Sequence, residues 1–98
     1  MLQKVYSKTG RACRVTFIVP ADANAKSVFL CGDFNDWDQS SHPLTQRKDG
    51  SFARMMWLKT GQQYRFRYWF DDNRWENDWA ADAYSPNPFG GDDSVIHL

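Results

Sequence analysis

Residues 63–71 read Gln63-Tyr64-Arg65-Phe66-Arg67-Tyr68-Trp69-Phe70-Asp71, and this stretch decides the fold. Aromatic residues occupy every second position on one side, and the other side carries two arginines and a tryptophan. A two-residue period is typical of a β-strand with one buried face. We therefore predict a strand here, with an aromatic inner face and an outer face carrying Arg65, Arg67 and Trp69.

Shorter stretches with the same period lie on both sides of this strand. We expect further strands at residues 3–8, 11–19, 26–33, 51–58 and 93–98. Polar loop is expected at residues 34–42, a hairpin turn at Lys48-Asp49-Gly50, and a long irregular stretch at residues 72–92. About seven short strands without helical periodicity predict an all-β chain. The fold class is an immunoglobulin-like antiparallel β-sandwich, a single domain over residues 1–98.

The composition argues against several classes of partner. The 98 residues include 12 basic and 12 acidic side chains, so the formal net charge is zero. Nucleic-acid-binding and membrane-binding surfaces carry an excess of Lys and Arg, so we expect no nucleic-acid and no membrane partner. No apolar stretch reaches the length of a membrane span, and Met1 is followed by no signal-peptide core. We therefore expect a cytoplasmic protein.

Two of the five tryptophans lie in polar surroundings. Trp37 ends the loop Gly32-Asp33-Phe34-Asn35-Asp36-Trp37, and Trp75 follows Asp71-Asp72-Asn73-Arg74. A tryptophan is stabilised by burial or by a flat partner. Two rings with parallel, solvent-open faces would form a stacking platform for a hydroxylated ring such as a sugar. The alternative is that both rings are core residues reached from loops.

The chain resembles carbohydrate-binding module family 48 in an ordered series of motifs. Val28-Phe29-Leu30-Cys31-Gly32-Asp33-Phe34-Asn35-Asp36-Trp37 resembles the family signature V-x-L-x-G-x-F-N-x-W. Similar matches follow at Phe66–Asp72, Trp75, Asn77-Asp78 and Asn87–Val95, so the resemblance extends from about residue 11 to residue 98. The family includes the glycogen-binding domain of the AMP-activated protein kinase β subunit. It also includes the N-terminal early-set domains of isoamylases and glycogen-branching enzymes.

The resemblance implies a surface that binds α-1,4-glucan, and it implies a role for several residues. Trp37 and Trp75 match the two stacking tryptophans. Arg67 matches a basic residue that bonds sugar hydroxyls, with a solvated arginine as the alternative. Phe89 matches an apolar residue that enters the bend of the glucan, with a loop anchor as the alternative. Asp93 replaces a family Asn, which keeps the acceptors but loses the amide donors.

Two further positions depart from the family pattern. Gly91 stands where the kinase-type domains have Thr, so one hydroxyl contact is missing. Trp79 stands where relatives often have Pro, and it could add a ring to the platform or pack the loop.

The residues indicate no catalytic site, no metal site and no cofactor. Eight aspartates lie in turn contexts with Gly and Asn, where Asp bends the chain, and a glycosidase needs two carboxylates across a deep cleft. The calcium-loop signature is missing from the sequence. By alternation Cys13 and Cys31 lie on different faces, so we expect two free thiols.

The sequence thus predicts a non-catalytic module that binds glycogen, starch or maltooligosaccharides, acting in trans with a glucan-metabolising enzyme. The alternative is a structural or protein-interaction domain without a working sugar site. Trp57 and Trp69 would favour that alternative if both were exposed on one sheet, because a large apolar patch marks an interface.

Overall fold

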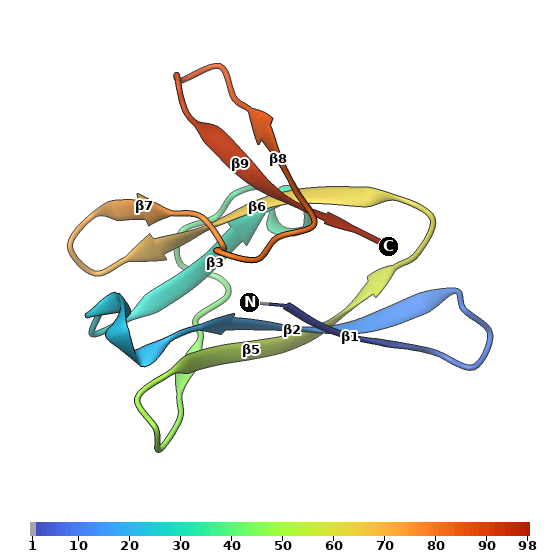
Figure 1. Cartoon of the computed structure of the whole chain (residues 1–98), viewed down its shortest axis with the longest axis horizontal. Coiled ribbons are helices and arrows are strands. Elements are labelled where there is room, and N and C mark those ends of the chain that lie inside the picture. The colour runs from blue at the N-terminus through green and yellow to red at the C-terminus, as the bar shows by residue number, and fades with distance from the viewer. Residues whose placement is uncertain (1) are drawn as a thin grey trace.

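The computed structural model describes residues 2–98, which form two antiparallel sheets packed face to face (Figure 1). The first sheet has the strand order β1 (Leu2–Tyr6), β2 (Ala12–Val19), β5 (Phe52–Lys59), β4 (Thr45–Gln46). The second has the order β3 (Val28–Gly32), β6 (Gln63–Phe70), β9 (Asp92–His97), β8 (Ala83–Pro86), and β7 (Arg74–Glu76) also pairs with β6. Single-turn 3-10 helices follow β2 and β3, namely η1 (Ala21–Ala23) and η2 (Asp33–Asn35). The fold is an immunoglobulin-like β-sandwich, as predicted.

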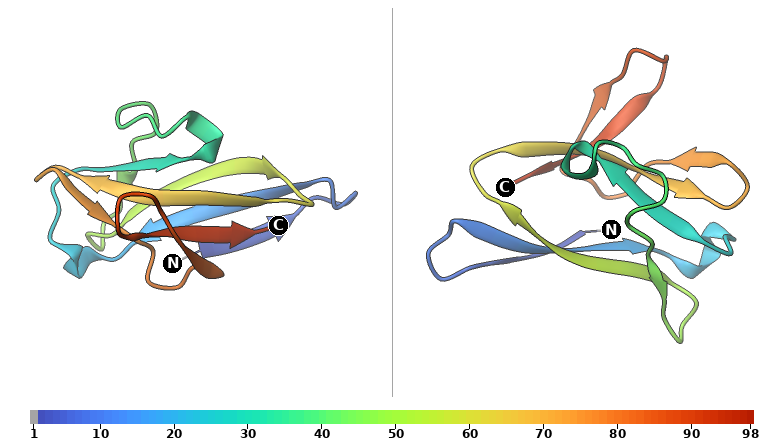
Figure 2. Two further views of the ribbon diagram at one scale, coloured as in Figure 1. Left: turned by 90° about the horizontal axis from the view of Figure 1, so that it is seen from above. Right: turned by 180° about the vertical axis from the view of Figure 1, so that it is seen from behind.

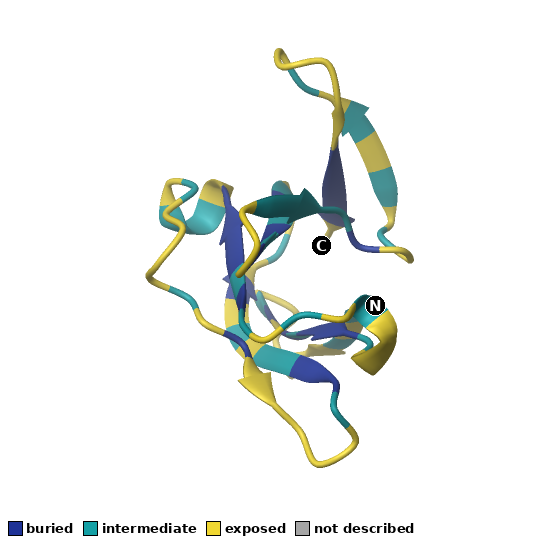
Figure 3. Cartoon of the chain, turned by 90° about the vertical axis from the view of Figure 1, so that its left-hand side faces the viewer, coloured by how far each residue is buried: buried dark blue, intermediate teal, exposed yellow. Residues whose placement is uncertain are grey.

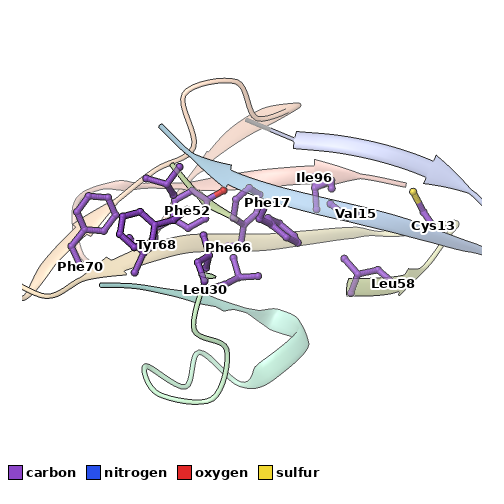
Figure 4. Close-up of a cluster of buried hydrophobic side chains, with 13 residues drawn as sticks. Cys13, Val15, Phe17, Leu30, Phe52, Leu58, Phe66, Tyr68, Phe70 and Ile96 are labelled. Carbon is purple, nitrogen blue, oxygen red and sulfur yellow. The ribbon is translucent and has the colours of Figure 1, made fainter. Parts of the chain in front are cut away.

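The core lies between the two sheets and is built from alternate residues of the facing strands. Figure 3 shows the buried segments on the strands that face one another, and Figure 4 shows their side chains. Phe17 of β2 and Phe66 of β6 meet edge to face at 5.1 Å between ring centroids. Full burial of an aromatic or aliphatic side chain of this size contributes about 1.5–3 kcal/mol. The inner face predicted for residues 63–71 is confirmed, because Phe66, Tyr68 and Phe70 are all buried.

One buried polar pair fixes the chain after β7. The Tyr68 hydroxyl donates to Asp78 Oδ2 at 2.7 Å, and Ala80 N donates to Asp78 Oδ1 at 2.8 Å. Burial, together with the negative charge of Asp78, raises the pKa of Tyr68 well above its usual value, so the phenol stays a donor. The segment after β7 is thereby held against β6.

The prediction that residues 72–92 form one irregular stretch is wrong, because it contains β7 and β8. Together with β4, which was also not among the predicted ranges, they bring residues 2–98 to nine strands, where about seven were expected. Both strands are short and carry charged residues or proline, so neither shows the alternating apolar pattern of a half-buried strand. They form because backbone groups of β6 and β9 offer pairing partners.

Tryptophans at the outer faces lie on different sheets. Trp57 lies on the outer face of the first sheet and is 58% exposed. Trp69 lies on the outer face of the second sheet, where its ring packs against Trp75. The condition that both be exposed on one sheet is therefore not met. Cys13 and Cys31 are free thiols, as predicted.

Gly32 allows η2 to lie close to β6, and an added methyl group there has no room. A Cβ at Gly32 would lie 2.6 Å from the Arg65 carbonyl oxygen and 2.8 Å from Phe34 Cζ. The backbone of Gly32 is extended, so only this close approach forbids a side chain. We predict that Gly32→Ala lowers the free energy of unfolding by about 1–3 kcal/mol, measured by urea denaturation.

Gly91→Ala is the matched control. Its Cβ would meet nothing closer than Asn87 Nδ2 at 3.7 Å, so the free energy of unfolding should change by less than about 0.5 kcal/mol. Equal stability of the two variants would contradict the importance of the close approach at Gly32.

Candidate functional site

A hollow of about 400 Å³ lies on the outer face of the second sheet. Its lining residues are Asp33, Trp37, Arg65, Arg67, Trp75, Asn87, Pro88, Phe89 and Asp93. All five residues that the resemblance implies as sugar contacts are among them, namely Trp37, Arg67, Trp75, Phe89 and Asp93. They come from β6, β7, β9 and two loops, and Figure 2 shows η2 lying beside β6 in the view from behind.

Strand pairing places Arg67 and Trp75 on the same face. In β6 the residue Arg67 points away from the core, and β7 pairs so that Trp75 lies opposite Trp69 on that same outer face. The two tryptophan rings are 4.7 Å apart between centroids. The Arg67 guanidinium carbon lies 5.7 Å from the centroid of the Trp75 ring, which is cation–π distance. Trp75 is thus supported on its strand by two neighbours.

Trp37 reaches the hollow because the chain turns sharply after η2. Asp36 and Trp37 both adopt positive φ, 54° and 59°. Trp37 N donates to the Gly32 carbonyl at 3.0 Å. Asn35 braces the turn, since its Nδ2 donates to Leu30 O and its Oδ1 accepts from Gly32 N, both at 2.9 Å. These bonds direct the indole towards Trp75.

The two stacking candidates form a right-angled corner rather than a flat platform. The Trp37 and Trp75 centroids are 6.4 Å apart and the ring planes are inclined by 71°. The parallel faces that would form a flat stacking platform are therefore not observed. An edge-to-face arrangement is favoured for a neighbouring ring pair because the positive edge of one ring meets the negative face of the other. Both rings are half-buried, so neither is a core residue.

Phe89 is the most exposed large apolar side chain of residues 2–98, at 94%. It lies at the tip of the β8–β9 hairpin, where Asn87 Oδ1 accepts from Phe89 N at 2.9 Å and from Gly91 N at 3.3 Å. The backbone of the tip is held, yet the phenyl ring has no core contact. The alternative of a loop anchor is therefore not supported by its burial.

Arg65 connects the hairpin to the sheet, a contact that the sequence analysis missed. Its guanidinium donates to Ser85 Oγ at 2.8 Å and to Pro86 O at 3.2 Å, and it pairs with Asp93 Oδ2 at 3.5 Å. Asn87 Nδ2 donates to Asp93 Oδ1 at 3.1 Å. Asp93 is buried, and both of its carboxylate oxygens have a partner, Arg65 for Oδ2 and Asn87 for Oδ1. The one signal for Arg65 in the sequence is its alternation with Arg67.

The guanidinium of Arg67 differs from that of Arg65 in having free donors. It donates no hydrogen bond within residues 2–98, and its Nε is buried without a hydrogen-bond partner. The terminal nitrogens of Arg67 are not buried and also lack a partner among these residues, so they are the donors that a hydroxylated ligand in the hollow could satisfy.

Asp33 also lines the hollow and was missed as a site residue. Its Oδ1 accepts from Trp37 Nε1 at 3.2 Å, and its Oδ2 accepts from Arg65 N at 2.8 Å. One carboxylate thus joins the indole of the loop to the backbone of β6. The hollow contains two carboxylates and two guanidinium groups, so its formal charge is balanced.

Trp79 does not lie in this hollow. It is 65% exposed and lines a separate cavity at one end of the sandwich. Of the two alternatives for Trp79, an additional ring beside Trp37 and Trp75 is therefore not observed.

The loop that carries Trp37 covers Cys31. The Cys31 thiol donates to Asp38 O at 3.3 Å, and burial, with a smaller contribution from the Asp38 charge, raises its pKa to about 11. His42, which contacts Asn35, has a lowered pKa because of burial and the nearby Arg54 charge. Both groups are therefore neutral at pH 7.

No cluster of three His, Cys, Asp or Glu side chains suited to a metal ion occurs within residues 2–98. Across the same residues, no helix has the length and apolar character to cross a membrane.

Three curated relatives are similar to parts of this chain, and all are named 1,4-alpha-glucan branching enzyme GlgB. The protein from Aquifex aeolicus is 39% identical over 56 residues, which cover 54% of this chain and 9% of that enzyme. The protein from Deinococcus radiodurans is 48% identical over 46 residues, 45% of this chain and 6% of the enzyme. The protein from Nitrobacter hamburgensis is 36% identical over 73 residues, 65% of this chain and 10% of the enzyme. The chain therefore corresponds to a tenth or less of each relative.

The family comparison covers most of the chain but stops before the β8–β9 hairpin tip. The matching residues are 4–85 rather than the expected 11–98, so Phe89 and Asp93 lie outside the match even though they line the hollow. Because residues 4–85 match the model of Carbohydrate-binding module 48 (Isoamylase N-terminal domain), the chain belongs to that family.

Proposed function

We propose that the hollow binds α-1,4-glucan and that the chain acts as a non-catalytic glucan-binding module. The observation that carries the proposal is that Trp37, Arg67, Trp75, Phe89 and Asp93, which are scattered over the sequence, line one hollow. Membership of a carbohydrate-binding family supports a sugar ligand, and the three relatives named for 1,4-alpha-glucan support its class.

The corner of two tryptophans suits a chain that turns. The C–H face of a pyranose is apolar, so an indole face buries it, while hydroxyls at the rim reach polar groups. Successive rings of an α-1,4-glucan are rotated relative to one another and present their faces in different directions. Two indoles inclined by 71° fit such a ligand better than they fit a flat, straight chain.

Hydrogen bonds complete the proposed site. Arg67 has free donors for the ring hydroxyl oxygens, and Phe89 extends an apolar surface from the hairpin tip. Asp93 holds the hairpin through Arg65 and Asn87 and acts in the site by positioning. Two stacks of about 1–2 kcal/mol each and a few hydrogen bonds of about 1 kcal/mol give a dissociation constant between about 10 μM and 1 mM.

The proposed module holds a glucan-metabolising enzyme close to its polysaccharide and carries out no chemistry itself. Both carboxylates of the hollow already accept bonds from chain donors: Asp33 from Trp37 and Arg65, Asp93 from Asn87 and Arg65. A glycosidase needs one carboxylic acid and one free carboxylate on either side of the scissile bond. Because both carboxylates are already hydrogen-bonded to donors of the chain, they support binding rather than catalysis.

A protein-interaction role is the second candidate, and one observation favours it. The outer face of the first sheet exposes Met55 and Trp57, each at 58%, on neighbouring outward positions of β5. This surface lies on the opposite sheet from the hollow, so the two roles do not exclude one another.

We expect Trp37→Ala and Trp75→Ala each to weaken glucan binding by about 5- to 30-fold, because each removes a stack of about 1–2 kcal/mol. The measurement is native affinity electrophoresis in gels with and without glycogen or amylopectin, with maltoheptaose as competitor. The wild type should be retarded, and both variants should migrate almost as in the gel without polysaccharide.

Trp57→Ala is the matched control, because it removes an exposed tryptophan from the other sheet. Its retardation should equal that of the wild type. Absence of retardation in a folded wild-type protein, or equal loss in all three variants, would overturn the proposal and favour the interaction role.

Asp33 is expected to orient Trp37 for binding. In Asp33→Asn an amide NH₂ replaces one oxygen, so either Trp37 Nε1 or Arg65 N loses its acceptor. We predict a loss of about 1–3 kcal/mol in the free energy of unfolding, a shifted Trp37 indole N–H resonance and weaker glucan retardation.

Asp36→Asn serves as its control. Asp36 is exposed and adopts φ of 54°, a conformation that Asn also tolerates, and its carboxylate has no hydrogen bond within residues 2–98. Stability and the Trp37 signal should be unchanged. If Asp33→Asn behaved like this control, Asp33 would have no role in orienting the indole.

A further inference from the structure

A second cavity of about 190 Å³ opens at the end of the sandwich where η1 and β7 lie, the left-hand end in Figure 1. Its apolar lining includes Ile18 and Val19 from the end of β2 and Phe70 from β6. Trp79, 65% exposed, stands at the same cavity. The cavity thus combines an apolar floor with an accessible indole.

This cavity and the first hollow lie on opposite faces of the β6–β7 ribbon. In β7, Arg74 pairs with Phe70 and Glu76 pairs with Tyr68, so both β7 side chains take the face of the core. Trp75, between them, takes the outer face and lines the first hollow. The ribbon separates the two cavities, so a single sugar ring cannot occupy both.

Arg74 closes one side of the cavity. Its guanidinium carbon lies 4.8 Å from the Phe70 ring centroid, and its NH2 donates to the Ala23 carbonyl of η1 at 3.3 Å. It also pairs with Glu76 at 3.6 Å. This arginine bridges β7 and η1, which belong to different layers of the sandwich, and so fixes the cavity wall.

Three lining groups have unused hydrogen-bonding capacity. The Asp22 carboxylate and the Trp79 indole N–H make no hydrogen bond within residues 2–98. The Glu76 carboxylate has only its ion pair with Arg74 and accepts no hydrogen bond from those residues. A carboxylate accepts only, so the ligand should donate several hydrogen bonds.

The charges around the cavity disfavour an anionic ligand, because the three carboxylates Asp22, Glu76 and Asp78 outnumber the single guanidinium of Arg74. A neutral molecule with several hydroxyl donors and one apolar face is a sugar ring. Drug-sized ligands occupy cavities of about 300–1,000 Å³, so a cavity of about 190 Å³ has room for one ring rather than for a chain.

We propose that this cavity is a second carbohydrate site, which takes one pyranose ring at a chain end. Trp79 stacks on the ring, and Asp22 and Glu76 accept its hydroxyl protons. The site stands on its own lining, and only the choice of maltose as probe rests on the proposed function. Two sites on opposite faces of the ribbon would let one module hold two chain segments of a polysaccharide, which raises the apparent affinity through effective concentration.

The test is a titration of ¹⁵N-labelled full chain with maltose, followed through indole and backbone amide resonances. Two groups of signals should shift with separate dissociation constants: the Trp37 and Trp75 indoles for the first hollow, and the Trp79 indole with the Ala23 amide for the second cavity. The double variant Trp37→Ala/Trp75→Ala should lose the first response and keep the second.

Variants of the second cavity should do the reverse. Trp79→Ala should raise the maltose dissociation constant measured at the Ala23 amide by at least fivefold. Trp79→Phe should retain most of the affinity because it keeps a stacking face. Asp22→Ala should raise the same dissociation constant severalfold. Trp57→Ala removes an indole of similar exposure elsewhere, 58% against 65% for Trp79, and should change neither response.

Three results distinguish failure of this inference from failure of the proposed function. If the Trp37 and Trp75 signals move while those of Trp79 and Ala23 stay fixed at saturating maltose, the second site is refuted and the first stands. If the double variant abolishes every shift, the second response was transmitted from the first hollow and the second site is again refuted. If only Trp79 and Ala23 respond, to maltose or to glucose, the second site is supported and the glucan role of the first hollow fails.

Discussion

Strand β6 carries the constraint on which the rest of this structure depends, because its two faces serve different purposes. Phe66, Tyr68 and Phe70 fill the core, while Arg65 and Arg67 take the opposite face. A slip of one residue in pairing would exchange the two sets and place guanidinium groups in the core. The core aromatics therefore fix the register, and the register in turn determines which arginines reach the hollow. Stability and the candidate site are set by one strand.

Loops complete the hollow, and a few polar side chains hold them to this strand. Asp33 ties the Trp37 indole to the backbone of β6, and Asn35 fixes the turn that precedes it. Arg65 does the same for the hairpin that carries Phe89. Each such bond contributes only about 1 kcal/mol to stability, but together they restrict where the aromatic rings can lie. A ligand then binds to rings whose ordering was completed during folding, which lowers the entropic cost of association.

The sequence allowed prediction of the elements whose burial produces a pattern. The alternation of β2 and β6 is visible without a structure, and so is the grouping of Trp37, Arg67 and Trp75 through the family resemblance. Strand β7 and strand β8 were not predictable because their stability comes from backbone pairing with β6 and β9. The 71° inclination between Trp37 and Trp75 depends on two consecutive residues of positive φ, which composition does not reveal. Arg65 was missed because its partners, Ser85 and Pro86, lie in the stretch expected to be irregular.

Strand β7, which was not predicted, gives the chain two distinct chemical surfaces. It has three residues, and their alternation directs Trp75 to the first hollow and Arg74 and Glu76 to the second cavity. A strand this short has almost no core of its own, so its position depends on pairing with β6 and on the contact of Arg74 with η1. The buried bond between Tyr68 and Asp78 anchors the chain that leaves it. The walls of both cavities are thus held by one ribbon, so the stability of the β6–β7 pairing sets how well either cavity is preorganised for a ligand.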